Sequence, residues 1–191
     1  MNGFVNYLCK EFDLTDIEKL KLKYSLDVLL LDVSKIIILF TLFYIIGEAR
    51  NFLYSVFALF LIRPLTGGFH FKTYISCLIF TSLFFLCVII LNRIISLDYY
   101  AVYMMISSCI VILGIAPIIN ENRPSYSESK KKHFKIFALS VIIIHLVLYL
   151  IAKRNPYLNI SIWVITLQSI QLLIKKGVDI CEKSKLNKNF T

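Results

Sequence analysis

Long apolar runs separated by short basic stretches dominate this sequence, and they leave few ways for the chain to fold. Of its 191 residues, 58% are hydrophobic, and the mean hydropathy is +0.75. A water-soluble domain of this length could not bury so much apolar surface. We therefore expect an all-α, polytopic integral membrane protein that forms a single membrane domain over residues 1–191.

The apolar runs predict where the membrane helices lie. Thr15 and Glu18 form a capping-box pattern, so a helix is expected to begin there and to become apolar at about Val28. The expected spans are 28–46, 51–62, 74–95, 99–119, 134–152 and 157–174, which gives about six membrane segments within residues 28–174. The second segment covers only about 18 Å of a hydrocarbon core about 30 Å thick. Its flanks must therefore extend it, or it tilts, or it forms a partly embedded hairpin with the loop Arg63–Thr73.

Three local features refine this outline. Residues 1–27 are expected to form a cytoplasmic, amphipathic amino-terminal region, although a frayed terminus would explain its spacing of apolar residues equally well. Asp32 and Lys35 lie three residues apart in the first span, so they share a helix face and are expected to form an ion pair. Pro117 is expected to end or kink the fourth span.

Basic residues predict the orientation of the chain. The net charge is +9, and the basic residues cluster between apolar segments, as positive-inside topology requires and nucleic-acid binding does not. With a cytoplasmic amino terminus and six crossings, the outer side holds only four basic residues, Arg50, Arg93, Lys153 and Arg154. The inner side holds sixteen: Lys10, Lys19, Lys21, Lys23, Arg63, Lys72, Arg123, Lys130, Lys131, Lys132, Lys135, Lys175, Lys176, Lys183, Lys185 and Lys188. Both termini, including the basic tail 175–191, are therefore expected to be cytoplasmic.

Metal and disulfide chemistry are not indicated. The five cysteines are odd in number and contain no paired CxxC pattern, which argues against a disulfide framework and a structural zinc site. His133 and His145 have no ligand partner four residues on, so no metal site is expected there. Cys87 and Cys109 lie inside apolar runs, where cysteine usually behaves as a small hydrophobic residue. No cofactor is expected.

His70 and Cys77 are the residues with the clearest chemical potential, because they lie where a glycine-containing loop enters a long apolar stretch. A thiol beside a general base can become a thiolate, the form that attacks carbonyl carbon. In one continuous helix the two residues would be about 10.5 Å apart along the axis, whereas proton transfer requires about 3 Å or one bridging water. His70 is therefore expected outside regular helix, with Gly67 and Gly68 allowing the loop to fold back over Cys77. An interfacial histidine and a packing cysteine are the non-catalytic alternative.

The sequence resembles the AgrB family of accessory gene regulator proteins. The resemblance rests on Arg63, Gly67-Gly68, His70 and Cys77 in a small basic protein with six expected spans. The stretch Ala116 to Pro124, followed by Lys130 to Lys132, resembles that family's second recognisable region. The pattern Gly-Gly-x-His-x6-Cys is moderately specific by itself and strong in this topology. The resemblance covers nearly the whole chain and departs at Phe71, where a small residue is usual.

The resemblance implies a membrane-embedded cysteine endopeptidase that processes an AgrD-type propeptide in Gram-positive quorum sensing. Carried over, Cys77 is the nucleophile and His70 is the general base, with the site near the cytoplasmic face of the bacterial cell membrane. A thioester on Cys77 would then close to a thiolactone or lactone on the peptide. A homodimer is compatible with the resemblance, but the sequence carries no interface motif for it.

Supporting roles in this site remain open. Arg63 is expected either to steer an acidic part of the peptide, to stabilise the oxyanion, or only to anchor the topology. Gly68 offers a main-chain N–H to the oxyanion, and Gly67 and Gly68 together form a hinge. The lysine run is most often a topology signal, although it also suits an acidic propeptide tail.

Two other classes of protein fit the same sequence. One is a small transporter, permease or peptide exporter, in which Asp32, Lys35 and the short second segment form a solute path. The other is a non-catalytic membrane scaffold, for which the Gly-Gly-x-His loop would be incidental. The chain has no inverted halves and few embedded charges, which counts against the transporter.

Overall fold

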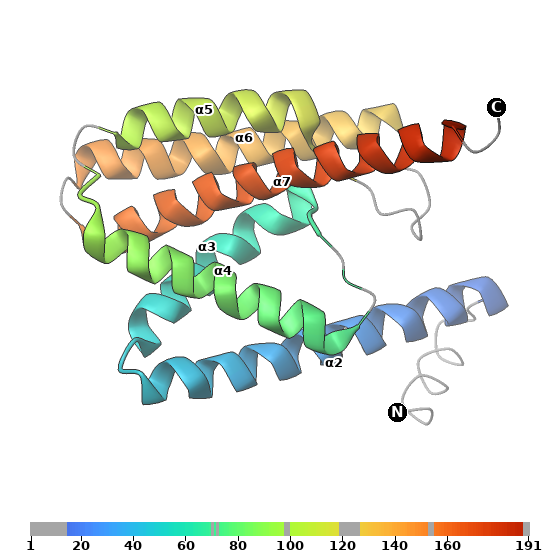
Figure 1. Cartoon of the computed structure of the whole chain (residues 1–191), viewed down its shortest axis with the longest axis horizontal. Coiled ribbons are helices and arrows are strands. Elements are labelled where there is room, and N and C mark those ends of the chain that lie inside the picture. The colour runs from blue at the N-terminus through green and yellow to red at the C-terminus, as the bar shows by residue number, and fades with distance from the viewer. Residues whose placement is uncertain are drawn as a thin grey trace. The chain divides into compact units, whose positions relative to one another are not determined.

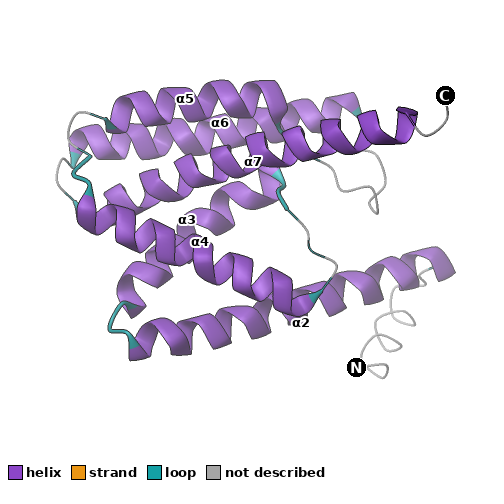
Figure 2. Cartoon of the chain, in the orientation of Figure 1, coloured by secondary structure: helices purple, strands orange, loops and turns teal. Residues whose placement is uncertain are grey.

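The computed structural model describes residues 15–69, 71, 73–97, 100–118, 127–152 and 155–188, and this part of the chain contains helices and no strands (Figure 2). The all-α expectation is thereby confirmed. The helices are α2 (Asp16–Ile45), α3 (Ala49–Thr66), α4 (Tyr74–Ile94), α5 (Ala101–Ile115), α6 (Glu128–Ile151) and α7 (Pro156–Lys188). Three parts of the sequence predictions lie outside the described residues: the amphipathic segment before Thr15, the stretch 119–126 that contains Asn122-Arg123-Pro124, and His70.

The chain divides into two compact units, residues 1–47 and 48–191. In the first unit, α2 begins as its sequence predicts: the Thr15 side chain accepts from the Glu18 N–H, and the Glu18 carboxylate accepts from the Thr15 N–H in return. Lys35 donates to Asp32 at 2.8 Å, so the expected ion pair is confirmed. These are local interactions between residues three apart in the sequence, which explains why the sequence alone predicts them.

The second unit is a bundle in which successive helices alternate in direction and α7 contacts each of the other four (Figure 1). The fully buried side chains of α7 include Ile160, Ile162, Val164, Ile165 and Leu172. Phe52 of α3 packs edge-on against Phe85 of α4, with ring centroids 5.0 Å apart. Because α7 contacts all four of these helices, residues of α3 and of the segment after α5 both lie beside it.

The two ends of this bundle differ in their chemistry. At one end, the buried carboxylate of Glu48 pairs with Arg93, the penultimate residue of α4, and accepts from Asn51. At the other end, the carboxyl end of α3 meets the middle of α7 at Gln168. The segment after α5 and the start of α6 line a cavity together with Lys176 and Asp179 of α7. The second end carries the glycine turn.

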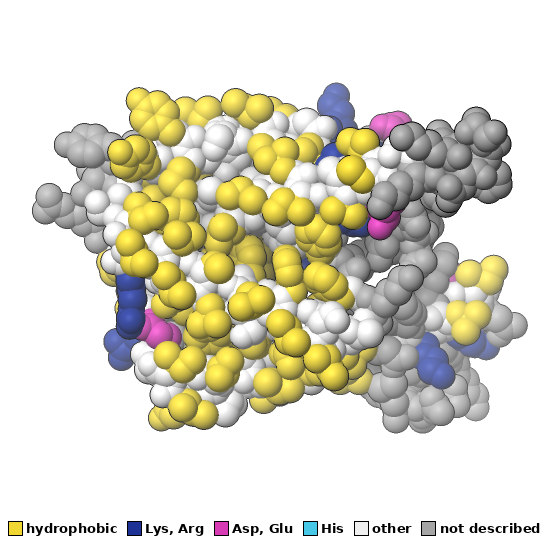
Figure 3. Space-filling model, viewed as in Figure 1, with side chains coloured by type: hydrophobic (Ala, Val, Ile, Leu, Met, Phe, Trp, Pro, Cys, Tyr) yellow, Lys and Arg dark blue, Asp and Glu magenta, His cyan; other side chains and the backbone are white. Residues whose placement is uncertain are grey.

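Three described helices are long and apolar enough to cross a membrane: α4, α6 and the part of α7 from Pro156 to Glu182. Helix α5 is apolar but spans only 15 residues. Hydrophobic side chains cover much of the visible face, and charged side chains lie mainly toward the helix ends (Figure 3). The structure therefore supports a membrane protein, while the count of six spans stays a prediction.

Several expected boundaries need correction. Helix α3 has 18 residues, a length of about 27 Å, because its flanks extend the short apolar segment on both sides. The loop that was expected from Arg63 therefore begins only at Gly67, with Pro64 inside the helix. Helix α5 ends at Ile115, two residues before Pro117, as the proline predicts. Helix α6 begins six residues earlier than the apolar run, since Ser127 caps it, and α7 continues through the basic tail to Lys188.

Candidate active site

A sharp turn at Gly67 follows α3, and the fold leaves no room there for a side chain. Gly67 has φ +77°, a conformation that side-chain-bearing residues rarely adopt. A Cβ atom at this position would lie 2.3 Å from the Ile118 carbonyl oxygen. The Ile118 N–H donates to the Thr66 carbonyl at 3.0 Å, so the segment after α5 is fastened to the turn. Glycine is therefore required at position 67 by backbone conformation and by packing.

Two buried glutamines of α7 lie against this turn. The Gln168 amide nitrogen donates to the Gly67 carbonyl at 2.7 Å and to the Thr66 hydroxyl at 3.1 Å. The Gln171 amide faces Gly68, where a Cβ atom would come within 3.1 Å of its nitrogen. Gln171 is buried, with only 4% of its surface exposed. Even so, neither its amide nitrogen nor its amide oxygen has a hydrogen-bond partner in the described part of the chain. Gln168 thus holds the turn, and Gln171 does not.

This difference predicts opposite effects of two matched substitutions on stability. Gln168→Leu leaves the Gly67 carbonyl without its donor, and we expect the free energy of unfolding to fall by about 1–3 kcal/mol. Gln171→Leu removes a buried amide without a partner, so stability is expected to stay equal or to rise. Thermal unfolding in lipid nanodiscs, followed by the fluorescence of the single tryptophan, Trp163, measures both. Equal destabilisation by the two variants would show that the turn does not depend on the Gln168 amide.

Beyond the turn, Phe69 is held from three sides. The Arg63 guanidinium donates to the Phe69 carbonyl at 3.2 Å, and the Lys175 ammonium lies 5.8 Å from the centre of the Phe69 ring. The ring also packs against Phe80 of α4, with centroids 5.7 Å apart. Phe71 also packs against the Phe80 ring, with centroids 5.0 Å apart. Arg63, which the sequence predicts as a site residue, therefore contacts the loop that carries the expected histidine.

Cys77 lies in the first turn of α4, three residues before Phe80. Thr73 caps the helix, because its hydroxyl accepts from the Ser76 N–H, and the Cys77 N–H donates to the Thr73 carbonyl at 3.2 Å. The Cys77 side chain is partly exposed. The amino-terminal end of a helix is the positive end of its dipole and stabilises negative charge, a suitable setting for an anionic nucleophile.

The predicted site residues thus fall into two groups. Gly67 contacts α7 and the segment after α5, and Arg63 holds Phe69 in the loop that follows, while Cys77 lies on α4. Phe69 and Phe71 link the groups, since both contact Phe80. His70 lies between these two phenylalanines in the sequence but outside the described residues. Gln168 and Gln171 were not predicted as site residues, although two glutamines three residues apart in a largely apolar run are a visible signal.

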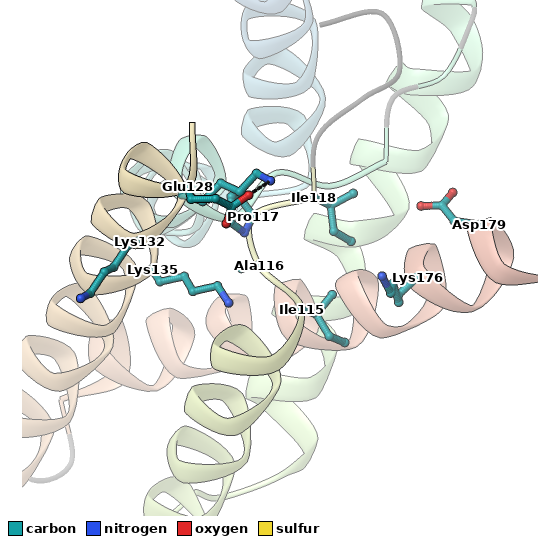
Figure 4. A pocket seen from close by; sticks show the side chains of 10 residues that line it. Ile115, Ala116, Pro117, Ile118, Glu128, Lys132, Lys135, Lys176 and Asp179 are labelled. Atoms are coloured by element: carbon teal, nitrogen blue, oxygen red, sulfur yellow. Dashed lines mark hydrogen bonds and ion pairs between the residues drawn. The ribbon is translucent and has the colours of Figure 1, made fainter. Parts of the chain in front are cut away.

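A cavity of about 650 Å³ lies beside the turn, between α6, α7 and the segment after α5 (Figure 4). Its apolar wall is Ile115–Ile118, and its charged residues are Glu128, Lys131, Lys132, Lys135, Lys176 and Asp179. Ile118 belongs both to this wall and to the contact with Thr66. The cavity and the turn therefore share one segment of chain.

Comparison with known proteins decides the family. The model of the accessory gene regulator B family matches residues 1–172. The chain is a member of the AgrB family. An AgrB-like protein from Clostridium beijerinckii is 36% identical over 174 residues, which are 90% of this chain and 85% of the relative. AgrB-like protein 1 from Clostridium perfringens (strain 13 / Type A) is 24% identical over 177 residues, which are 92% and 95% of the two chains.

No solved structure matches this AgrB chain significantly. The resemblance drawn from the glycine–histidine–cysteine stretch is confirmed by the family match. Membership supports a role in accessory gene regulator quorum sensing at a membrane and suggests the involvement of an AgrD-type propeptide.

Proposed function

We propose that this AgrB protein is a cysteine endopeptidase that cleaves the carboxyl-terminal part of an AgrD-type propeptide and lets the remaining peptide close into a thiolactone or lactone. Cys77 is the nucleophile, and His70 is the general base. The family match supports the quorum-sensing context. The chemistry rests on the residues around Cys77.

One observation carries the proposal: both sequence neighbours of His70 pack on the helix that bears Cys77. The rings of Phe69 and Phe71 lie 5.7 and 5.0 Å from that of Phe80, one helical turn after Cys77. This contact of Phe69 and Phe71 with α4 supports the proposal that the loop between them brings a base toward the thiol. The large side chain of Phe71, unusual for the family, is accommodated in this aromatic contact.

The reaction proceeds in two acyl transfers. His70 takes the proton of the Cys77 thiol, the sulfur attacks a peptide carbonyl, and His70 then protonates the leaving amine as the C–N bond breaks. The product is a thioester on Cys77 and a released tail. A Cys or Ser side chain of the same peptide attacks this thioester, which frees Cys77 and closes the ring.

Ring closure must outrun hydrolysis of the thioester. A well-oriented intramolecular nucleophile has an effective molarity of about 10⁵ M or more, well above the concentration of water. A site from which water is partly excluded favours closure further. In this proposal the site lies at the cytoplasmic edge of the membrane, with both termini cytoplasmic, where the lipid limits access of water.

The other site residues have supporting roles in the proposal. Gly67 and Gly68 set the direction in which the loop leaves α3, and Arg63 holds that loop through the Phe69 carbonyl. A guanidinium already committed to the loop suits positioning better than steering of the substrate. The Gly68 N–H remains the candidate oxyanion donor.

Reconstitution tests the proposal. The purified chain in nanodiscs is given an AgrD-type propeptide with an amphipathic start, a central Cys or Ser, an acidic tail and a carboxyl-terminal fluorophore; the neighbouring reading frame is where we expect its natural counterpart. We expect release of the labelled tail and a cyclic product, both lost after thiol alkylation by iodoacetamide. Cleavage that survives alkylation would exclude a cysteine mechanism.

A transporter gives the reverse pattern of sensitivity. It would tolerate Cys77→Ala and fail with Asp32→Asn, since Asp32 forms the ion pair of α2. The endopeptidase is expected to lose cleavage with the first variant and to keep it with the second. A scaffold would show no cleavage at all.

A further inference from the structure

The cavity beside the glycine turn holds more positive than negative charge. Its ten lining residues include four lysines and two acidic residues. The Glu128 carboxylate is paired with Lys131 at 2.7 Å, and the Asp179 carboxylate is paired with Lys175 at 2.6 Å. Each acid of the cavity thus has a dedicated lysine. Lys132, Lys135 and Lys176 line the cavity in addition to Lys131, so its positive charges outnumber its carboxylates.

Two of these lysines approach the cavity from different helices. Lys135 comes from α6 and donates to the Leu113 carbonyl at 2.9 Å, and Lys176 comes from α7. Figure 4 shows them on either side of the segment Ile115–Pro117. Both residues line the same cavity, and lysine side chains from two helices around one cavity favour an anionic ligand there.

The surroundings indicate the class of anion. On α6, Ile136 and Phe137 directly follow Lys135 and are 52% and 58% exposed. On α7, Leu173 and Ile174 directly precede Lys175 and are 47% and 55% exposed. Both helices are long and apolar enough to span a membrane. The cavity therefore lies where two candidate spans change from charged to outward-facing apolar residues, the level at which lipid headgroups lie.

We propose that this cavity binds the phosphate-bearing headgroup of an anionic phospholipid, with the phosphate between Lys135 and Lys176 and the glycerol against the apolar wall. A volume of about 650 Å³ suits a headgroup and glycerol backbone. The exposed apolar side chains beside the lysines give the acyl chains a surface to follow. This ligand is independent of the proposed peptidase activity.

The cavity is also connected to the glycine turn. Ile118 forms part of its wall, and the Ile118 N–H donates to the Thr66 carbonyl directly before Gly67. A headgroup that fixes the wall therefore stabilises the turn. Anionic lipid is expected to raise the thermal midpoint of unfolding as well as to bind.

Lipid titration with native mass spectrometry tests the site directly. The full chain in a neutral detergent is titrated with phosphatidylglycerol and, separately, with phosphatidylcholine. We expect preferential retention of phosphatidylglycerol. The variant Lys135→Gln/Lys176→Gln should bind it about 25-fold more weakly, the product of roughly 5-fold for each lysine. The matched control is Lys19→Gln/Lys23→Gln, two exposed lysines of α2, which should bind as the unchanged chain does. Trp163 fluorescence verifies that each variant is folded.

Competition separates the lipid from other anions. Excess glycerol 3-phosphate and an acidic hexapeptide should both fail to displace the bound phosphatidylglycerol. Displacement by glycerol 3-phosphate would identify a site for free phosphate, and displacement by the hexapeptide a site for peptide carboxylates; either result would overturn the proposal. Equal retention of phosphatidylcholine, or an equal loss in the α2 control, would overturn it too. None of these results requires cleavage, so the peptidase proposal can fail without affecting them.

Discussion

Replacing Cys77 with alanine is expected to abolish propeptide cleavage while the fold persists. The sulfur is the atom that forms the acyl-enzyme in the proposed mechanism. Removal of a catalytic nucleophile costs several orders of magnitude, so we expect a loss of at least about 10³-fold in tail release. The fluorescence-release assay in nanodiscs measures this loss.

The matched control is Cys87→Ala on the same helix. Cys87 is an exposed cysteine ten residues after Cys77, and it should retain the activity of the unchanged chain. Both variants should show the same thermal midpoint by Trp163 fluorescence, because neither sulfur lies in the buried core. Retained cleavage in Cys77→Ala, or an equal loss in Cys87→Ala, would remove Cys77 from the mechanism.

Gly67→Ala is expected to have the largest effect on the architecture of the site. The new Cβ would meet the Ile118 carbonyl at 2.3 Å, and a residue with a side chain at φ +77° and ψ −156° costs about 1–3 kcal/mol. Relief of the clash requires Ile118 to move away from Thr66, which lengthens the hydrogen bond between them. Together these effects should lower the free energy of unfolding by at least about 2 kcal/mol. Cleavage should fall by about 100-fold, since a displacement of about 1 Å is enough for such a loss.

Two other glycines separate the causes of this loss. Gly47 has φ +80° with nothing near its Cβ position, so Gly47→Ala reports the conformational cost alone. Gly114 lies inside α5 with open space beside it, so Gly114→Ala should be neutral or stabilise by up to about 1 kcal/mol. The same thermal and cleavage assays apply to all three variants. Should Gly67→Ala behave like Gly47→Ala, the close approach of Ile118 would have no energetic consequence.

The parts of the fold that depend on neighbours in sequence could be predicted. The capping box at Thr15, the ion pair of Asp32 and Lys35 and the end of α5 before Pro117 each follow from residues within four positions of one another. The apolar runs likewise indicated every helix, although not its ends. Helix α7 continues to Lys188, beyond the apolar run 157–174, because polar residues are also compatible with a helix.

The tertiary contacts of the site were beyond such reasoning. Gln168 meets Gly67 across 101 positions, and Ile118 meets Thr66 across more than fifty. No spacing rule links residues that far apart, so the sequence predicted the glycines as a hinge but not what holds them. The cavity has the same origin, because its lysines come from two helices that only the fold brings together. The chemical roles of His70 and Cys77 remain predictions from the family resemblance.

The most direct measurement of the central claim is the mass of the Cys77 peptide during turnover. The chain is mixed with propeptide in nanodiscs, quenched in acid and digested, and the fragment with Cys77 is identified by mass spectrometry. We expect an adduct with the mass of the propeptide lacking its tail, joined to the Cys77 sulfur and released by hydroxylamine. Tail release without any such adduct, or an adduct on a different residue, would contradict the account.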